Sequence, residues 1–326
     1  MKDTGPEYYV QGVLNNNRRI IAKTITLIES SLAQDRTISF EIVKKILPFS
    51  GKSIRIGITG IPGVGKSTFI ENLGLYLIKS GHRVAVLAVD PTSQKSGGSI
   101  LGDKTRMEKL AAHDKSFIRP SPAGNTLGGV AAKTREAMLV CEAAGYDVIL
   151  VETVGVGQSE TKVSTMVDFF LVLLIAGAGD ELQGIKKGIL EIADAIAINK
   201  ADNDNIEKAE KAKKVYEMAL HLVLPGRSSW NTPVLTCSSV TENGTENVWQ
   251  TVLQHNKLMK QTKDFDQKRR EQAVEWMWNL VDEGLKKRFM ETGIIKNKIP
   301  EVANSVQQGL ISPSAAAEEL LSYINL

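Results

Sequence analysis

The segment Gly60–Ser67 constrains the fold of this chain more than any other stretch. It reads Gly-Ile-Pro-Gly-Val-Gly-Lys-Ser, so a glycine is followed by four residues and then by Gly-Lys-Ser. An apolar run typical of a strand precedes it, at 54–58, and a stretch typical of a helix follows from Thr68. Glycines allow the backbone to curl so that successive N–H groups point inward at phosphate oxygens. The pattern therefore predicts a phosphate-binding loop between a strand and a helix.

The polar residues of this loop have separate expected roles. The ammonium of Lys66 is placed to reach the β- and γ-phosphates of a nucleotide, and the hydroxyl of Ser67 is placed to bind Mg²⁺. The positive end of the following helix adds a favourable field for the phosphates. The residues expected to contact the nucleotide here are Gly60, Pro62, Gly63, Val64, Gly65, Lys66, Ser67 and Thr68.

The stretch from 51 to 242 alternates apolar runs of strand length with helical stretches of a dozen or more residues. Near-continuous apolar strands that alternate with helices predict a parallel sheet covered on both faces. The fold class is therefore α/β: a P-loop NTPase with a mostly parallel sheet and helical extensions at both ends. Ligands of such sheets bind at the carboxyl ends of the strands. The expected strands are 54–58, 84–89, 148–151, 169–175, 195–198 and 234–236.

Two aspartates follow the second expected strand. Asp90 comes directly after it, and Asp103 lies in the glycine-rich, polar stretch 96–107. Long polar loops in compact domains usually serve function. An aspartate alone is more often a helix cap or a turn residue, but beside a phosphate-binding loop both carboxylates are candidates for binding Mg²⁺ or its waters.

Glu152 ends the third expected strand, and Gly155 follows it by three positions. An acidic residue there is expected to hold a water of the metal ion, and the N–H of Gly155 is expected to sense a γ-phosphate. GTPases usually have aspartate at this position, so the glutamate is a departure. Gln158 does not directly follow the glycine, and no water-positioning role is assigned to it.

A charged, glycine-containing segment, 177–188, follows the fourth expected strand. Lys186 or Lys187 could approach the negative charge that develops on a transferring phosphate. A solvated lysine pair is an equally good interpretation. The candidate catalytic residues from sequence are Lys66, Asp90, Glu152 and Lys186.

The tetrapeptide Asn199-Lys200-Ala201-Asp202 follows the fifth expected strand. The carboxylate of Asp202 can accept hydrogen bonds from guanine N1–H and from its exocyclic amine, a donor pair that adenine does not present. Asn199 is expected to support the loop and the base, and the stem of Lys200 to lie over the ring. Ser238, Ser239 and Val240, after the last strand, are expected to form the remaining base-contacting loop.

Helical extensions flank this region and suggest three parts: an N-terminal extension at 1–50, the nucleotide-binding domain at 51–242 and a C-terminal arm at 243–326. In the N-terminal part, Ser39 is expected to precede a short helix. In the arm, Ser312 is expected to cap the last helix. Trp276 and Trp278 are two positions apart, so one helix cannot bury both on one face. We therefore expect the arm to form a homodimer, with packing inside the chain as the alternative.

Composition limits the kinds of partner. The 40 basic and 37 acidic residues give a net charge of +3, which offers no case for a nucleic-acid partner. No apolar stretch is long enough to cross a bilayer, so no membrane partner is expected. Cys141 and Cys237 are isolated, which suits a reducing compartment, and a cytoplasmic location is expected.

Together these motifs resemble the MeaB/ArgK family, the GTPase chaperones of methylmalonyl-CoA mutase that are related to the human cobalamin type A disease protein. The run Glu152–Glu160 is especially specific to this family. The glutamate at its start resembles the residue that the family usually has at this position. The segments that carry the resemblance are Gly57–Thr68, Val89–Ser93, Gly97–Met107, Glu152–Glu160 and Asn199–Asp202.

The resemblance implies a homodimeric GTPase that binds an adenosylcobalamin-dependent mutase, gates the loading of its cofactor and protects it. It also implies a mobile third switch at Gln183–Gly188. The Mg²⁺ set that it implies is Ser67, Asp90, Asp103 and Glu152.

Two other functions stay open at this point. One is a kinase of an amino-acid (arginine/ornithine) transport system, although no separate phospho-acceptor site is evident. The other is a metallochaperone GTPase, whose relatives carry His-rich or Cys-rich segments. The four histidines here are scattered along the chain and have no zinc or nickel ligand spacing: His82, His113, His221 and His255.

Overall fold

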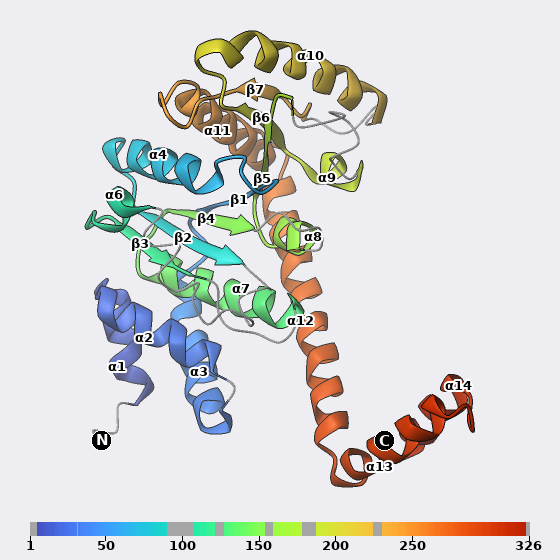
Figure 1. The fold of residues 1–326 in the computed structure, drawn as a ribbon. Helices are drawn as coiled ribbons and strands as arrows, with labels where there is room; N and C mark the ends of the chain where they lie inside the picture. The colour runs from blue at the N-terminus through green and yellow to red at the C-terminus, as the bar shows by residue number, and fades with distance from the viewer. Residues whose placement is uncertain are drawn as a thin grey trace. The chain divides into compact units, whose positions relative to one another are not determined.

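The computed structural model describes residues 5–30, 32–89, 107–120, 127–153, 159–177, 187–223 and 230–323 (Figure 1). The chain forms two compact units, residues 1–272 and residues 273–326. The three-part division suggested by the sequence, at residues 50 and 242, remains a prediction. Among the described residues, no helix is long and apolar enough to cross a membrane.

A seven-stranded sheet with parallel neighbouring strands forms the centre of the first unit. Its strand order is β3-β2-β4-β1-β5-β6-β7. This confirms the predicted fold class and the six expected strands. The edge strand β3 was not expected, because it has only four residues and two of them are polar. The strands are β1 (Ile54–Gly60), β2 (Val84–Val89), β3 (Ser116–Arg119), β4 (Val148–Thr153), β5 (Phe169–Ile175), β6 (Ala195–Asn199) and β7 (Val234–Thr236).

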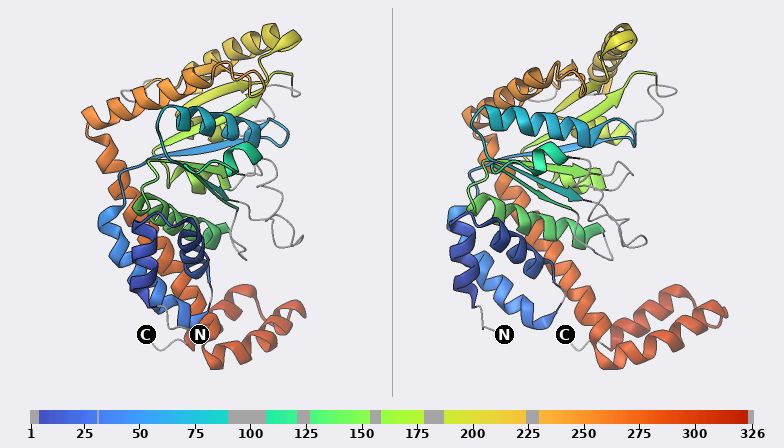
Figure 2. Two further views of the ribbon diagram at one scale, coloured as in Figure 1. Left: turned by 90° about the vertical axis from the view of Figure 1, so that its left-hand side faces the viewer. Right: turned by 60° about the vertical axis from the view of Figure 1, so that its left-hand side comes forward.

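Helices bury both faces of the sheet. Successive side chains of a strand point to opposite faces, so these apolar strands present apolar side chains on both faces. Ile149 and Val151 of β4 belong to one hydrophobic cluster, whereas Val148 and Leu150 belong to the other. The first cluster includes residues of α1 (Pro6–Leu14), α2 (Arg18–Glu29), α3 (Ala33–Ile46), α7 (Leu127–Ala143) and α10 (Ile206–Val223). The second includes residues of α4 (Lys66–Lys79), α6 (Glu108–Ala111) and α11 (Thr245–Gln261). Figure 2 shows the sheet between α4 and α7.

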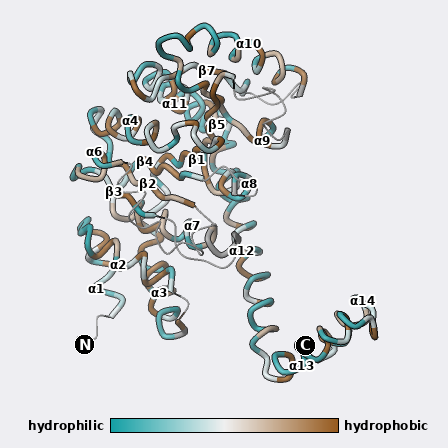
Figure 3. The backbone as a smooth tube through the Cα atoms, in the orientation of Figure 1, coloured by the Kyte–Doolittle hydropathy of each residue, from teal (hydrophilic) through white to brown (hydrophobic). Residues whose placement is uncertain are grey.

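The apolar character of the chain follows this layering. Figure 3 shows hydrophobic segments in the central strands and mostly hydrophilic ones in α12 (Asp264–Glu291). Short elements complete the first unit: η1 (Leu47–Phe49), α8 (Ser159–Ser164), α9 (Lys187–Ile192) and η2 (Asn203–Asn205). The second unit contains the later turns of α12 with α13 (Gly293–Gln307) and α14 (Pro313–Ser322). Ser312 caps α14 as predicted, since its Oγ accepts a hydrogen bond from the N–H of Ala315 at 3.1 Å.

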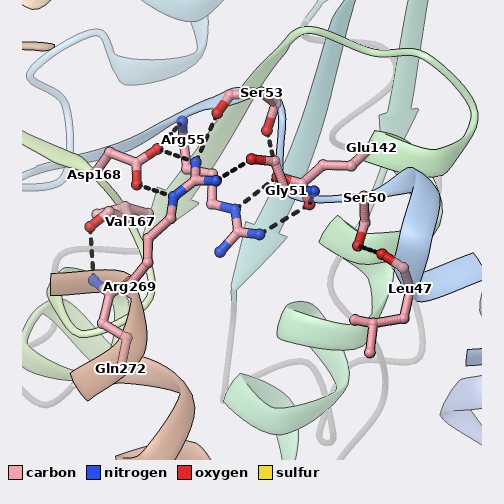
Figure 4. Close-up of polar contacts among 10 residues, drawn as sticks. All are labelled: Leu47, Ser50, Gly51, Ser53, Arg55, Glu142, Val167, Asp168, Arg269 and Gln272. Atoms are coloured by element: carbon pink, nitrogen blue, oxygen red, sulfur yellow. Dashed lines mark hydrogen bonds and ion pairs between the residues drawn. The ribbon is translucent and has the colours of Figure 1, made fainter. Parts of the chain in front are cut away.

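Two interlocked ion pairs hold the start of α12 to the amino ends of the strands (Figure 4). Arg269 of α12 donates to Asp168, with Nε–Oδ1 at 2.8 Å and Nη2–Oδ2 at 2.7 Å. Arg55 of β1 donates through Nε and Nη2 to Glu142 of α7 at 2.8 and 2.9 Å. Burial raises the pKa of Glu142, but the charge and hydrogen bonds of Arg55, with hydrogen bonds from Ser53 and Gly51, leave that pKa below its ordinary value. The network fixes the edge of the sheet away from the strands' carboxyl ends.

Candidate nucleotide site

The carboxyl ends of β1, β4, β6 and β7 lie at the same edge of the sheet, because neighbouring strands are parallel. Each predicted motif follows one of these ends: the phosphate-binding loop follows β1, and the Asn-Lys-x-Asp motif follows β6. Glu152 lies in the last two residues of β4, directly opposite Ile58 of β1. The topology therefore brings together motifs that are more than a hundred residues apart in sequence.

The backbone of the phosphate-binding loop requires glycine at both of its ends. Gly60 has φ +156°, and a Cβ there would lie 2.5 Å from the carbonyl oxygen of Leu173. Gly65 has φ +94°, and a Cβ there would lie 2.9 Å from Nδ2 of Asn199. Larger residues would be both strained and in collision at these positions. Gly65 is the N-cap of α4, so the loop leads directly into the positive end of that helix.

Lys66 folds back over the loop that precedes it. Its Nζ donates to the carbonyl oxygens of Gly60 at 2.7 Å and Ile61 at 3.3 Å. Burial lowers the pKa of Lys66, and the nearby carboxylates of Glu152 and Glu160 oppose that shift. A partly desolvated ammonium that donates to neutral carbonyl groups is well prepared to exchange them for phosphate oxygens, which accept stronger, charge-assisted hydrogen bonds.

Oxygen atoms suited to a hard cation converge next to Lys66. The hydroxyl of Ser67 donates to Oε1 of Glu152 at 3.2 Å. In the same part of the sheet, the hydroxyl of Thr153 donates to that of Thr59 at 2.7 Å, which ties the end of β4 to β1. Mg²⁺ prefers oxygen ligands and usually keeps several waters, so a hydroxyl and a carboxylate side by side fit this ion. The other two expected ligands, Asp90 and Asp103, lie outside the described residues.

Asn199 connects the loop after β6 to two other parts of the site. Its side chain is fully buried, and its Nδ2 donates to the carbonyl oxygen of Val64 at 2.8 Å. Its Oδ1 accepts hydrogen bonds from Ser239, at 3.0 Å from the backbone nitrogen and 2.8 Å from the hydroxyl. One amide thus joins the phosphate-binding loop to the loop after β7.

Asp202 is held by the same neighbouring loop. The hydroxyl of Ser238 donates to its Oδ2, and the N–H of Ala201 donates to the carbonyl oxygen of Cys237 at 3.0 Å. Lys200 has φ +60° and its carbonyl oxygen accepts from the amide of Asn205 at 2.8 Å. These bonds give the Asn-Lys-x-Asp turn a defined shape before any ligand binds.

The remaining predicted residues differ in how the structure places them. Val240 is 79% exposed, at the open end of the loop after β7. Gly155 and Lys186 lie outside the described residues. Sequence reasoning missed Thr59, Thr153 and the amide of Asn72 on α4, which donates to the carbonyl oxygen of Ser239. Each is one polar residue among others in its element, and no motif marks it.

Comparisons with known proteins give this geometry a family. Residues 21–293 match the family described as methylmalonyl-CoA mutase-associated GTPase MeaB. A protein of Caulobacter vibrioides described as a GTPase is 50% identical over 95% of both chains. The GTPase ArgK of Escherichia coli is 42% identical over 97% of this chain and 95% of its own.

Two further comparisons extend the likeness. The mitochondrial methylmalonic aciduria type A homolog of Mus musculus is 42% identical over 95% of this chain and 77% of its own. The crystal structure of a LAO/AO transport system kinase superposes with a TM-score of 0.77 at 35% identity, covering 100% of this chain and 99% of that one. The chain therefore belongs to the MeaB/ArgK family of P-loop GTPases, and its reaction is the hydrolysis of GTP.

Proposed function

We propose that this GTPase is a nucleotide-dependent chaperone of an adenosylcobalamin-dependent mutase of the methylmalonyl-CoA type. Its nucleotide state would gate the loading of the mutase cofactor and protect the mutase. The family description, matched over residues 21–293, names an association with that mutase. The observation that carries the proposal is that match, supported by a site in which one amide, that of Asn199, links the predicted phosphate-binding loop to the loop after β7.

The proposed mode of binding uses both halves of the site. Backbone N–H groups of the loop and the ammonium of Lys66 bind the β- and γ-phosphates, and the carboxylate of Asp202 accepts from guanine N1–H and the exocyclic amine. Ser238 holds Asp202 in place for this role. Lys200 and the loop from Ser238 to Val240 border the base.

Mg²⁺ is the proposed cofactor, and it would neutralise charge between the phosphate groups when it is bound. Ser67 and Glu152 would hold it or its waters, with Asp90 and Asp103 as the other proposed ligands. The ammonium of Lys66 would lie beside the scissile bond and stabilise the charge that builds up on the phosphate oxygens. Gly155 as a γ-phosphate sensor and Lys186 as a cationic finger remain proposals from the sequence.

The mutase association can be tested by size-exclusion chromatography of the full chain mixed with a methylmalonyl-CoA mutase. We expect co-elution, with an affinity that changes between GDP and a non-hydrolysable GTP analogue, because a nucleotide switch needs a partner that binds its two states differently. Separate elution in both nucleotide states would contradict the proposal. Bovine serum albumin at the same concentration serves as the control partner.

A homodimer through α12 is the second part of the proposal. One face of this helix borders an apolar groove of about 480 Å³, formed by Ala273, Trp276, Met277, Leu280, Val281, Gly284, Leu285 and Arg288. Several of its large side chains are open to water, including Met277 at 49% and Leu285 at 58% exposure. A contiguous apolar patch of this kind commonly marks a protein interface. A second copy of the helix would cover it with the same patch, as a two-fold interface requires.

Leu280→Glu is expected to convert the proposed dimer to a monomer at micromolar concentration, since a two-fold interface would then bury two uncompensated carboxylates. Light scattering after size-exclusion chromatography measures the mass directly. Lys286→Glu introduces a carboxylate at an exposed position of the same helix outside the groove, and it should leave the mass unchanged. A dimer that survives Leu280→Glu would place the interface elsewhere.

A transport-linked kinase is the alternative that a specific comparison favours, because the superposed crystal structure carries that description. Incubation with γ-labelled GTP distinguishes the two functions. We expect the label to be released as inorganic phosphate. Transfer of the label to a second protein would favour the kinase.

A further inference from the structure

Asn72 places an amide group on the helix that begins in the phosphate-binding loop. It lies six residues after Lys66 on α4, and its Nδ2 donates a hydrogen bond to the backbone carbonyl oxygen of Ser239. Asn72 is half-buried and Ser239 is only 5% exposed. The contact therefore joins α4 to the loop after β7 in a place that water does not readily reach.

Ser239 is held from two sides. Its N–H and hydroxyl donate to Oδ1 of Asn199, while its carbonyl oxygen accepts from Asn72. The amide of Asn199 donates in turn to the carbonyl oxygen of Val64 in the phosphate-binding loop. Because Val64 and Asn72 belong to one continuous loop and helix, these bonds close a ring. Every polar backbone group of Ser239 is bonded within it.

The ring also fixes the residue before Ser239 in the loop. Ser238 precedes Ser239 and donates its hydroxyl to Asp202, while the same oxygen accepts from the N–H groups of Val240 and Thr241 at 3.3 and 3.2 Å. A shift of Ser239 would therefore move the side chain that holds Asp202. A nucleotide carries its phosphate groups at one end and its base at the other. The distance between the phosphate-binding loop and the base-contacting loop therefore decides whether both ends can bind at once.

We propose that Asn72 is a positioning residue for guanine recognition, which ties the loop from Ser238 to Val240 to the phosphate-binding helix. Asn199 fixes that loop relative to Val64, before the helix begins. Asn72 adds a second point, about 1.7 turns into α4, so the loop can no longer pivot about the first. Asn72 touches neither the phosphates nor the base in this scheme and acts through Ser238 and Ser239.

Two substitutions separate this role from simple packing. Asn72→Ala removes the donor and leaves the carbonyl oxygen of Ser239 without its partner. Asn72→Asp keeps the shape of the side chain but turns a carboxylate oxygen toward that carbonyl oxygen, so attraction becomes repulsion. If Asn72 only fills space, the aspartate variant behaves like the parent protein. If it positions the loop, the aspartate variant is the more severely affected.

The test is calorimetric titration of the full chain, in the presence of Mg²⁺, with GDP, inosine diphosphate and inorganic pyrophosphate. Inosine diphosphate lacks the exocyclic amine that Asp202 is proposed to bind, and pyrophosphate probes the phosphate-binding loop alone. We expect Asn72→Ala to weaken GDP binding about tenfold and to reduce the preference for GDP over inosine diphosphate. Asn72→Asp should weaken it further. Pyrophosphate affinity should stay within about twofold of the parent value, because the hydrogen bond that these variants lose lies outside the phosphate-binding loop.

Lys79→Ala, at an exposed position near the end of α4, is the control and should change none of the three affinities. Equal weakening of GDP and pyrophosphate binding would show that Asn72 supports the helix and not the base-contacting loop. Parent-like GDP binding by Asn72→Asp would overturn the proposal outright. Because the aspartate is isosteric, that variant decides the question even where the alanine variant folds poorly.

Discussion

Lys66→Ala is expected to lower the affinity for GTP by roughly a hundredfold and kcat/KM for its hydrolysis by about a thousandfold. The ammonium is the charged side chain that the phosphate-binding loop itself carries, and it already lies over the loop carbonyls of Gly60 and Ile61. Its loss removes charge-assisted hydrogen bonds in the bound state and further stabilisation in the transition state. Titration calorimetry and phosphate release measure the two effects separately.

The Lys66→Ala variant should fold normally in the absence of nucleotide. Burial disfavours the charged form of Lys66, as its lowered pKa shows, so replacing it removes an unfavourable desolvation along with two bonds to neutral carbonyl groups. We expect an unchanged or slightly raised Tm without nucleotide, and the loss of the Tm increase that GTP gives the parent protein. A variant that folds and still binds GTP tightly would refute the assignment of this loop.

Asp202→Asn is expected to reverse the base preference from guanine to xanthine. The carboxylate is suited to two donors, whereas an asparagine amide offers one acceptor and one donor, which matches the carbonyl oxygen at C2 of xanthine. We expect GTP affinity to fall about a hundredfold, because a hydrogen bond to a charged group is lost and an amine is left unpaired. Affinity for xanthosine triphosphate should rise above that for GTP. Competition titrations with the two nucleotides give the ratio.

Asp204→Asn is the matched control, since it makes the same change at an exposed residue two positions away. It should leave the preference for GTP intact. Undiminished preference for GTP in Asp202→Asn would show that another residue reads the base. The Asp202→Asn variant keeps an acceptor for the hydroxyl of Ser238, so the loop after β7 should hold its shape.

The parts of the fold that were predictable from sequence are those in which one physical cause dominates. Strands such as Phe169–Ile175 are buried on both faces, so their apolar runs identify them without tertiary information. Ser39 shows the limit. It was expected to precede a helix, but α3 begins at Ala33 and the hydroxyl of Ser39 donates to the carbonyl oxygen of Asp35 inside it. That expectation was wrong because serine can satisfy its hydroxyl within a helix as well as cap one.

The site divides in the same way. The phosphate-binding loop and Asn199–Asp202 can be recognised from sequence, because their chemistry requires several residue types at fixed spacing. The bond of Asn72 to Ser239 joins residues 167 positions apart and depends on how α4 and the end of β7 meet, which no local pattern records. The same holds for Thr59 and Thr153, which meet only because β1 pairs with β4.

The most direct test of the proposed function is the rate of GTP hydrolysis by the full chain with and without a methylmalonyl-CoA mutase, measured as phosphate release. We predict a slow intrinsic rate that changes severalfold when the mutase is added, and no such change in the Lys66→Ala variant, which should hydrolyse little GTP in either condition. A hydrolysis rate that stays the same at saturating mutase, together with separate elution of the two proteins, would contradict the proposal that this GTPase serves a mutase.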